Sequence, residues 1–180
     1  MNLAARSFLL GVTFSLLSTA IRGETLAFPG AEGWGRHAKG GGQDVNTKVL
    51  FVTSLADSGP GTLREALETR GPRIIIFKTG GVIEFTQKMS FAEGHVTIAG
   101  QTAPGDGIIV RNFPIRIGAS NVVMRGLRIR NGDGPGPKGD VRDGIQFGRV
   151  EGERTHDVIV DHCSFGWSVA ILIGALVLGS

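Results

Sequence analysis

The chain has 180 residues, of which 41% are hydrophobic and 19% charged, and it carries a formal net charge of +3. This length allows one domain with a buried core. The basic residues do not cluster with aromatic ones, so the charge does not indicate nucleic-acid binding. The single cysteine, Cys163, excludes an internal disulfide. We expect Cys163 to be a small buried hydrophobic residue rather than a nucleophile, because it alternates between His162 and Phe165.

The first 23 residues have the pattern of a secretory signal peptide. Arg6 precedes an apolar stretch over residues 8–17, and small residues such as Ala20 follow it. This stretch is shorter than the roughly 20 residues that cross a bilayer. A buried N-terminal helix is the alternative, which the lack of a polar face disfavours. We therefore predict a signal peptide over 1–23 and a nearly neutral secreted protein, extracellular or periplasmic, without a membrane span.

Short β patterns follow one another along the rest of the chain, separated by Gly, Pro, Asn and Asp. The one good helical pattern is "TLREALE" at 62–68, with Thr62 or Ser58 as a possible N-cap. Such a series of strands predicts either an antiparallel sandwich or a stack of parallel coils. The predicted strands lie at 49–55, 73–79, 81–85, 95–100, 107–112, 115–118, 121–130, 145–150 and 157–165.

An internal repeat favours the stack of coils. "HVTIAGQ" at 95, "NVVMRGL" at 121 and "DVIVDHC" at 157 share a polar residue, a valine and an apolar residue, at spacings of 26 and 36. Both spacings suit one turn of a β-solenoid, the longer with a loop around 131–144. We predict an all-β solenoid domain over 24–169, with the sandwich as the alternative. The expected inward-facing pairs, coil upon coil, are Val96 with Ile98, Val122 with Met124, and Val158 with Val160.

Five ordered segments resemble the pectate lyase-like proteins of polysaccharide lyase family 1. They are "AFPGAEGWGRHAKGG" at 27–41, "VTSLADSGPGTLREALE" at 52–68, "GPRIIIFKTGGVIEF" at 71–85, "VTIAGQTAPGDGI" at 96–108 and "DVIVDHCSFGWS" at 157–168. The resemblance implies a right-handed parallel β-helix, secretion, calcium dependence and eliminative cleavage of polygalacturonate. The implied partner is an acidic polysaccharide such as pectate, bound by a monomer, with no nucleic acid or membrane partner.

Two features near the start suit this fold. The helix at 62–68 would cover the open end of the first coil as a short N-terminal cap. Trp34, in the glycine-rich "FPGAEGWG", is expected to be a packing anchor; stacking on sugar rings is the alternative.

Candidate calcium ligands stand in "KGDVRDGIQF", just before a predicted strand. Calcium prefers several oxygen ligands, and carboxylates on neighbouring coils can gather around one ion. Asp143 best matches the calcium-binding aspartate of the family, and Asp140 is the second candidate. The alternative is that both aspartates only form turns, as Asp next to Gly commonly does.

Asp161 and His162 match the Asp-His motif of the family. Adjacent residues of a strand point to opposite faces, so we expect the two not to act together. A hydrogen-bonded His162 is favoured over a metal-bound one. Arg125, Arg128 and Arg130 could meet acidic sugars, but a solvated strand face explains them equally well.

The resemblance ends after Ser168. The acidic pair of the family would fall at Ala170 and Ile171, and the apolar residues 170–180 form a divergent tail. In the family the catalytic base is an arginine on a later coil, so no catalytic residue is assigned here. We expect the N-terminal part of a lyase, inactive as it stands; a genuine short chain whose tail caps the last coil is the alternative. A non-catalytic β-helix that binds acidic polysaccharide is the competing function.

Overall fold

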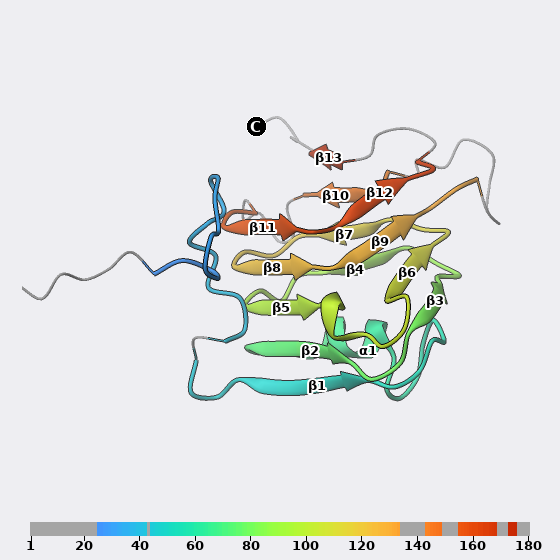
Figure 1. Cartoon of the computed structure of the whole chain (residues 1–180), viewed down its shortest axis with the longest axis horizontal. Helices are drawn as coiled ribbons and strands as arrows, with labels where there is room; N and C mark the ends of the chain where they lie inside the picture. Colours follow the sequence, from blue (N-terminus) through green and yellow to red (C-terminus); the bar gives the residue numbers. More distant parts are fainter. Residues whose placement is uncertain (1–24, 43, 134–142, 149–154, 169–172, 176–180) are drawn as a thin grey trace, which may run out of the picture.

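Three parallel sheets, each formed by strands from successive coils, build the molecule (Figure 1). The computed structural model describes residues 25–42, 44–133, 143–148, 155–168 and 173–175. Sheet A contains β1 (Lys48–Val52), β2 (Arg73–Phe77), β5 (Val96–Ala99), β8 (Val122–Arg125) and β11 (Val158–Asp161). Sheet B contains β3 (Gly81–Glu84), β6 (Ile108–Arg111), β9 (Leu127–Arg130) and β12 (Ser164–Gly166). Sheet C contains β4 (Met89–Phe91), β7 (Ile115–Ile117), β10 (Ile145–Phe147) and β13 (Ile173–Ala175).

The chain visits sheets A, B and C in turn, and all the strand pairs described are parallel. This is the predicted right-handed parallel β-helix, and the antiparallel sandwich is wrong. β13 pairs with β10, so residues 173–175 of the predicted tail extend sheet C. The predicted boundary between domain and tail lies outside the described residues, as do the signal residues 1–23.

The sequence repeat corresponds to the stacking of sheet A. Val96 pairs with Val122, and Val122 pairs with Val158, as predicted. Ile98, Met124 and Val160 form the next row in the same way. The side chains of the two lower coils lie in the main hydrophobic core inside the coils, and Val158 and Val160 pack against it.

The polar residue at the start of each repeat has its own physical reason. His95, Asn121 and Asp157 have φ angles of 51°, 58° and 51°, in the left-handed region. Each lies where the chain turns from sheet C into a strand of sheet A. Asn, Asp and His adopt this conformation more readily than most residues. The repeat therefore encodes both a corner and an inward-facing strand.

Two predicted strands are each divided by a corner. Residues 121–130 form β8 and β9 on either side of Gly126, whose φ is 68°. Residues 157–165 form β11 and the start of β12, divided near His162, whose φ is 49°. The strands β4 and β13 were not predicted, and β13 lies in the stretch predicted to be a divergent tail.

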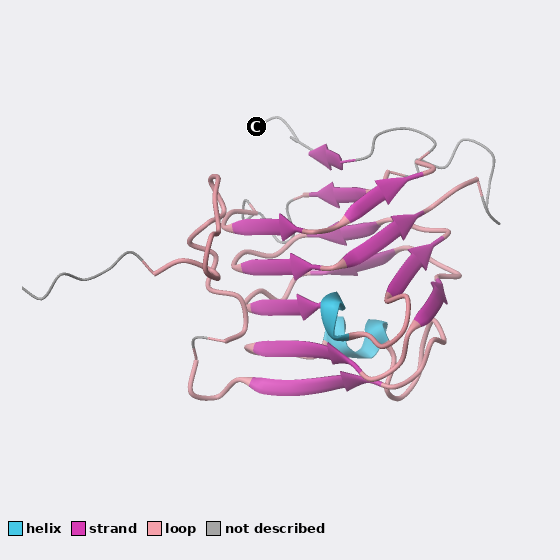
Figure 2. Ribbon diagram, in the orientation of Figure 1, coloured by secondary structure: helices cyan, strands magenta, loops and turns pink. Residues whose placement is uncertain are grey.

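The helix α1 (Leu63–Glu68) covers the lower end of the core, as predicted. Thr62 is the N-cap, since its side chain accepts a hydrogen bond from the backbone of Glu65. Leu63 and Leu67 are fully buried and belong to the hydrophobic core, and α1 contacts β1 and β4. Figure 2 shows α1 together with the short 3₁₀ helix η1 (Gly100–Thr102), which directly follows β5 in the middle of the stack.

Residues 25–42, which we call the N-terminal strap, lie against the outer face of sheet A. Ala31 and Ala38 are buried there against Val123 and Ile159, which point away from the main core. Trp34 is fully exposed, so its predicted role as a packing anchor is wrong. The strap packs instead through small residues, which allow its backbone to approach the sheet closely.

Candidate functional site

Asp143, the first calcium candidate, lies in the turn just before β10. Asp143 is only 5% exposed. The Nε2 atom of Gln146 donates a hydrogen bond to Asp143 Oδ2 at 3.0 Å. The side-chain amide of Asn131, which directly follows β9 in the same coil, donates to the backbone oxygen of Asp143. Asp143 is therefore held inside its coil, between the end of β9 and β10, rather than in an exposed turn.

Asn131 adds an oxygen to this turn. It is 1% exposed, and its Oδ1 atom has no hydrogen-bond partner among the described residues. A buried acceptor without a donor is costly, and a cation would satisfy it. The carboxylate of Asp143 and the amide oxygen of Asn131 are donors of the type that calcium prefers. The donor type fits calcium, but the number of donors is small.

The second predicted calcium ligand, Asp140, lies outside the described residues. Within the described part of the chain, no group of three or more His, Cys, Asp or Glu residues could hold a metal ion. The structure therefore places one predicted ligand in a buried turn, outside any such group among these residues.

Asp161 and His162 lie side by side, so the expectation that they point to opposite faces is wrong. The strand β11 ends at Asp161, and His162 takes the corner position that Gly126 occupies in the coil below. This turn brings His162 Nδ1 to 2.8 Å from Asp161 Oδ2, while the His162 side chain stays 79% exposed. His162 is thus paired with a carboxylate, as favoured from the sequence.

Asp161 also joins two coils. Arg125 Nε donates a hydrogen bond to Asp161 Oδ2 at 2.7 Å, and the two residues are register partners in sheet A. Burial raises the pKa of Asp161, but hydrogen bonds from His162 and Arg125 outweigh it and hold the pKa below its usual value. The Arg125 guanidinium stacks 3.9 Å from the ring centroid of Phe28 in the strap. These contacts make Asp161 a bridge between coils and strap.

Cys163 has the inert character expected of it. It packs against the main core, and burial raises the pKa of its thiol above the usual value. A protonated thiol is a poor nucleophile, so Cys163 has no catalytic character.

The three unassigned arginines separate once the coils are formed. Arg125 points outward from sheet A toward the strap, as described above. Arg128 and Arg130 point outward from sheet B, where Arg130 donates to the backbone oxygen of Ser164 at 2.8 Å and to its hydroxyl at 2.7 Å. The basic pattern of "MRGLRIR" therefore serves two different faces, which the spacing alone does not show.

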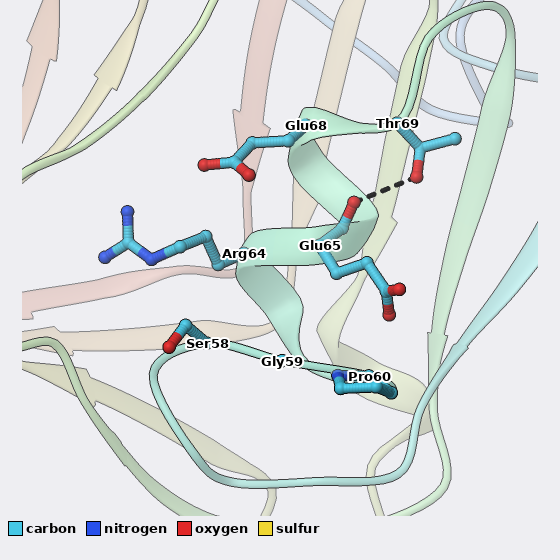
Figure 3. Close-up of a pocket in the computed structure, with 7 residues that line it drawn as sticks. All are labelled: Ser58, Gly59, Pro60, Arg64, Glu65, Glu68 and Thr69. Atoms are coloured by element: carbon cyan, nitrogen blue, oxygen red, sulfur yellow. Dashed lines mark hydrogen bonds between the residues drawn. The ribbon is translucent and has the colours of Figure 1, made fainter.

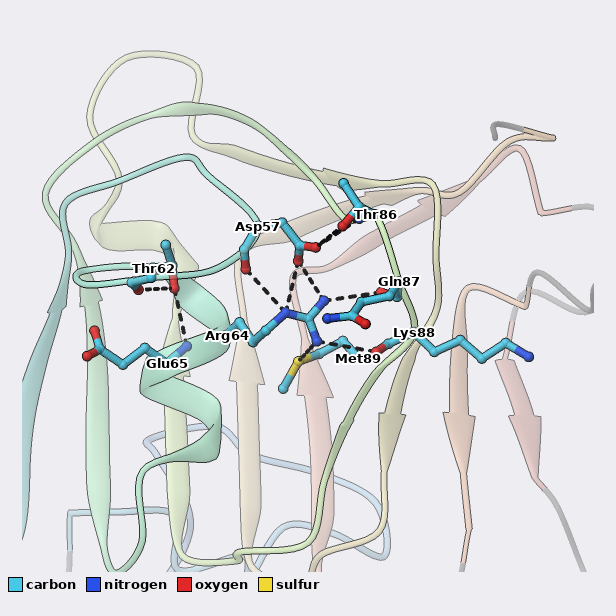
Figure 4. A network of polar contacts seen from close by, with 9 residues as sticks. Asp57, Thr62, Arg64, Glu65, Thr86, Gln87, Lys88 and Met89 are labelled. Carbon is cyan, nitrogen blue, oxygen red and sulfur yellow. Dashed lines mark hydrogen bonds and ion pairs between the residues drawn. The ribbon is translucent and has the colours of Figure 1, made fainter. Parts of the chain in front are cut away.

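A hollow of about 460 Å³ lies between the loop at Ser58–Pro60 and helix α1 (Figure 3). Arg64, the cationic residue that lines this hollow, already binds other groups. Its guanidinium donates hydrogen bonds to Asp57 Oδ1 at 2.6 Å and to the backbone oxygen of Gln87 at 3.1 Å (Figure 4). The remaining charged groups are the carboxylates of Glu65 and Glu68. This hollow does not suit an acidic sugar.

The chain is similar in sequence to several fungal proteins named probable pectate lyase C. It is 45% identical over 143 residues to that of Aspergillus oryzae, covering 79% of this chain and 31% of the relative. It is 42% identical over 168 residues to that of Aspergillus fumigatus, covering 93% and 36%. It is 44% identical over 144 residues to that of Emericella nidulans, covering 79% and 31%. The chain thus spans about a third of the length of these relatives. No family model matches it.

The fold is similar to a solved structure, that of Jun a 1, the major allergen from cedar pollen. The TM-score is 0.63 at 23% sequence identity, covering 81% of this chain and 44% of the allergen. A likeness at this identity concerns the fold alone. No helix in the described ranges combines the length and the apolar character that a bilayer crossing requires.

Proposed function

The described coils are homologous to the pectate lyase-like proteins, and from this relationship we propose that the chain is part of a secreted, calcium-dependent lyase that acts on polygalacturonate. The observation that carries this proposal is the 41–45% identity to the probable pectate lyases C. Secretion rests on the signal pattern of residues 1–23.

Eliminative cleavage of a uronate requires three contributions. The carboxylate must be neutralised, the adjacent proton must be removed, and the glycosidic oxygen must leave. Bound calcium would supply the first contribution as a Lewis acid. Asp143 and Asn131 are the described residues whose oxygens fit the ion, and Asp143 would also be oriented by Gln146.

We propose that these 180 residues bind polygalacturonate without cleaving it at a measurable rate, because the family resemblance assigns the base to none of the described residues. Loss of a single preorganised group in a catalytic site already lowers the rate by about a hundredfold or more. With only Asp143 and Asn131 as described donors, calcium should bind weakly, in the millimolar range that is typical of sparse sites.

The test uses residues 24–180 with polygalacturonate and calcium. Binding is followed by affinity electrophoresis, and cleavage by the absorbance of the unsaturated product. We expect retardation that weakens with chelator and in Asp143→Asn, and no growth of absorbance. Asp44→Asn is the matched control, because Asp44 is exposed in another loop. Steady product formation abolished by chelator and by Asp143→Asn would overturn the lack of cleavage, and absence of retardation would overturn the proposed substrate.

A further inference from the structure

One row on the outer face of sheet B combines apolar and cationic side chains. Val82, Ile109 and Arg128 are register partners on the neighbouring strands β3, β6 and β9. All three are accessible, and Val82 is 37% exposed. Two apolar side chains therefore lie in one row with a guanidinium group on the outer face of sheet B.

This row forms one wall of a groove. The groove has a volume of about 500 Å³ and is lined by Gly80–Val82, Pro104–Gly107, Ile109 and Arg128. Its two loops are tied together, since Gly81 N donates to the backbone oxygen of Gly107 at 2.9 Å. The volume lies in the range of small-molecule sites, roughly 300–1,000 Å³. The groove is thus a built feature of the coils and not a gap between loose loops.

Arg128 differs from its neighbours on this face. Arg111 is paired with Glu84, and Arg130 is bonded to Ser164. In contrast, Arg128 has neither a hydrogen bond nor an ion pair within the described residues, although it is partly buried. A methyl group on Gly107 would lie 3.4 Å from an Arg128 terminal nitrogen, so the guanidinium lies over the backbone of this glycine. A guanidinium group that is fixed in place, and that donates to no acceptor among the described residues, is suited to bind an anionic ligand.

We propose that this groove binds one uronic acid unit of the substrate, with Arg128 holding the carboxylate. The proposal rests on the proposed function, and it adds a binding subsite on sheet B that lies apart from the turn of Asp143. Val82 and Ile109 offer an apolar surface to the face of the sugar ring. Asp106, exposed at the rim, can accept hydrogen bonds from sugar hydroxyl groups.

The experiment is an NMR titration of residues 24–180 with trigalacturonate, beside Arg128→Gln. We expect shift changes at residues 80–82 and 104–109, and affinity about tenfold weaker in Arg128→Gln, because a charge-assisted contact is lost. Arg128→Lys keeps the charge without the planar fork, and should fall between the two. Arg70→Gln is the matched control, since the Arg70 side chain is 90% exposed and does not line the groove. Higher salt should weaken binding to the unaltered chain.

The other possible outcomes distinguish a failure of the Arg128 subsite from a failure of the proposed function. Trigalacturonate binding elsewhere, with Arg128→Gln unaffected, would overturn the subsite and leave the proposed function in place. Absence of any binding by trigalacturonate and by polygalacturonate would overturn both. Equal shifts at the same residues with inorganic phosphate or with neutral maltotriose would show that the groove does not select uronic acids. Thermal melting of each variant confirms that the coils remain folded.

Discussion

At the scale of single residues, Arg73 shows how this fold holds a buried charge with backbone carbonyl groups. Its side chain is fully buried. It donates five hydrogen bonds to backbone oxygens, including those of Ala66 and Leu67 in α1 and of Glu93 and Gly94 in a loop of the next coil. Burial lowers the pKa of Arg73 to about 10, so the guanidinium remains charged at neutral pH. The charge lies among the last carbonyl oxygens of α1, where a cation is favoured.

Replacing Arg73 with Ala should therefore destabilise the chain by about 4 kcal/mol, because it leaves buried carbonyl groups without donors and opens a cavity. The measurement is urea unfolding followed by circular dichroism. Arg70→Ala is the control, since its side chain is 90% exposed and its contact with Glu93 is 4.0 Å long. We expect a change within about 0.5 kcal/mol there. Similar losses in the two variants would show that the Arg73 bonds contribute little.

At the scale of elements, the N-terminal strap is fixed by close backbone contact. A methyl group on Gly35 would collide with the backbone oxygen of Val158 in β11. Further along the strap, Lys39 N donates to Asn121 Oδ1 at 3.2 Å and Gly41 N donates to Thr97 Oγ1 at 3.0 Å. The strap thus crosses from β11 toward β5 and ties the coils together from outside.

Gly35→Ala should loosen the strap, because the added methyl group has no room against β11. We expect faster hydrogen exchange over residues 25–42 and at the edge of β11, with the core of sheet A still protected. Gly42→Ala is the matched control, since its nearest contact would be Ile74 Cδ1 at an ordinary 3.7 Å. Equal protection of the strap in both variants would contradict this account.

The loop carrying Asp57 is joined to α1 and to the turn before β4 by one ion-pair network (Figure 4). The side chains of Asp57 and Arg64 are 9% and 8% exposed. Burial raises the pKa of Asp57, but hydrogen bonds from Thr86 and Arg64 outweigh it and hold the pKa below its usual value. A carboxyl group of this kind stabilises the fold above its unfolded pKa of about 4.

Asp57→Asn should therefore destabilise the fold at pH 7 by about 2 kcal/mol. The substitution removes the buried ion pair with Arg64, while the Asn side chain keeps one oxygen that can accept a hydrogen bond. The difference from the unaltered chain should shrink as the pH falls from about 4 through the lower folded pKa, where Asp57 becomes neutral. Melting temperatures from pH 7 to about 3 measure it. A difference that stays constant over this range would show that the charge of Asp57 is not responsible.

At the scale of the whole molecule, one hydrophobic column passes through all the coils. Ile98 in β5 is fully buried, with Ile75 and Met124 as its register partners below and above. No single coil can bury such a face alone, so the coils depend on their neighbours.

Ile98→Ala should cost about 2–5 kcal/mol, as large-to-small changes in a packed core do. It should also lower the stability of all the coils in one transition, measured by circular dichroism during urea unfolding. Val49→Ala in β1 is the control, because Val49 is 48% exposed. Separate transitions for the lower and upper coils would show that the column does not unfold as a unit.

The sequence by itself determined the coils, because their rules are local. A left-handed corner residue followed by alternating apolar positions marks each strand of sheet A, as at Asn121 and Asp157. The helix could be predicted for the same reason. Its N-cap, Thr62, and its first buried residue, Leu63, are neighbours in the sequence. Strands of three residues lie at the limit of what alternation can reveal, since β7 was predicted and β4 was not.

Only the tertiary structure decided which outward-facing residues meet, because that depends on register between distant coils. Arg125 reaches Asp161 across 36 positions of sequence, and Arg128 joins Val82 across two strand pairs. A corner also overrides the strand rule locally, which is why His162 lies beside Asp161. Inward-facing residues share one apolar interior whatever their partners, whereas the chemistry of an outer face changes with each neighbour.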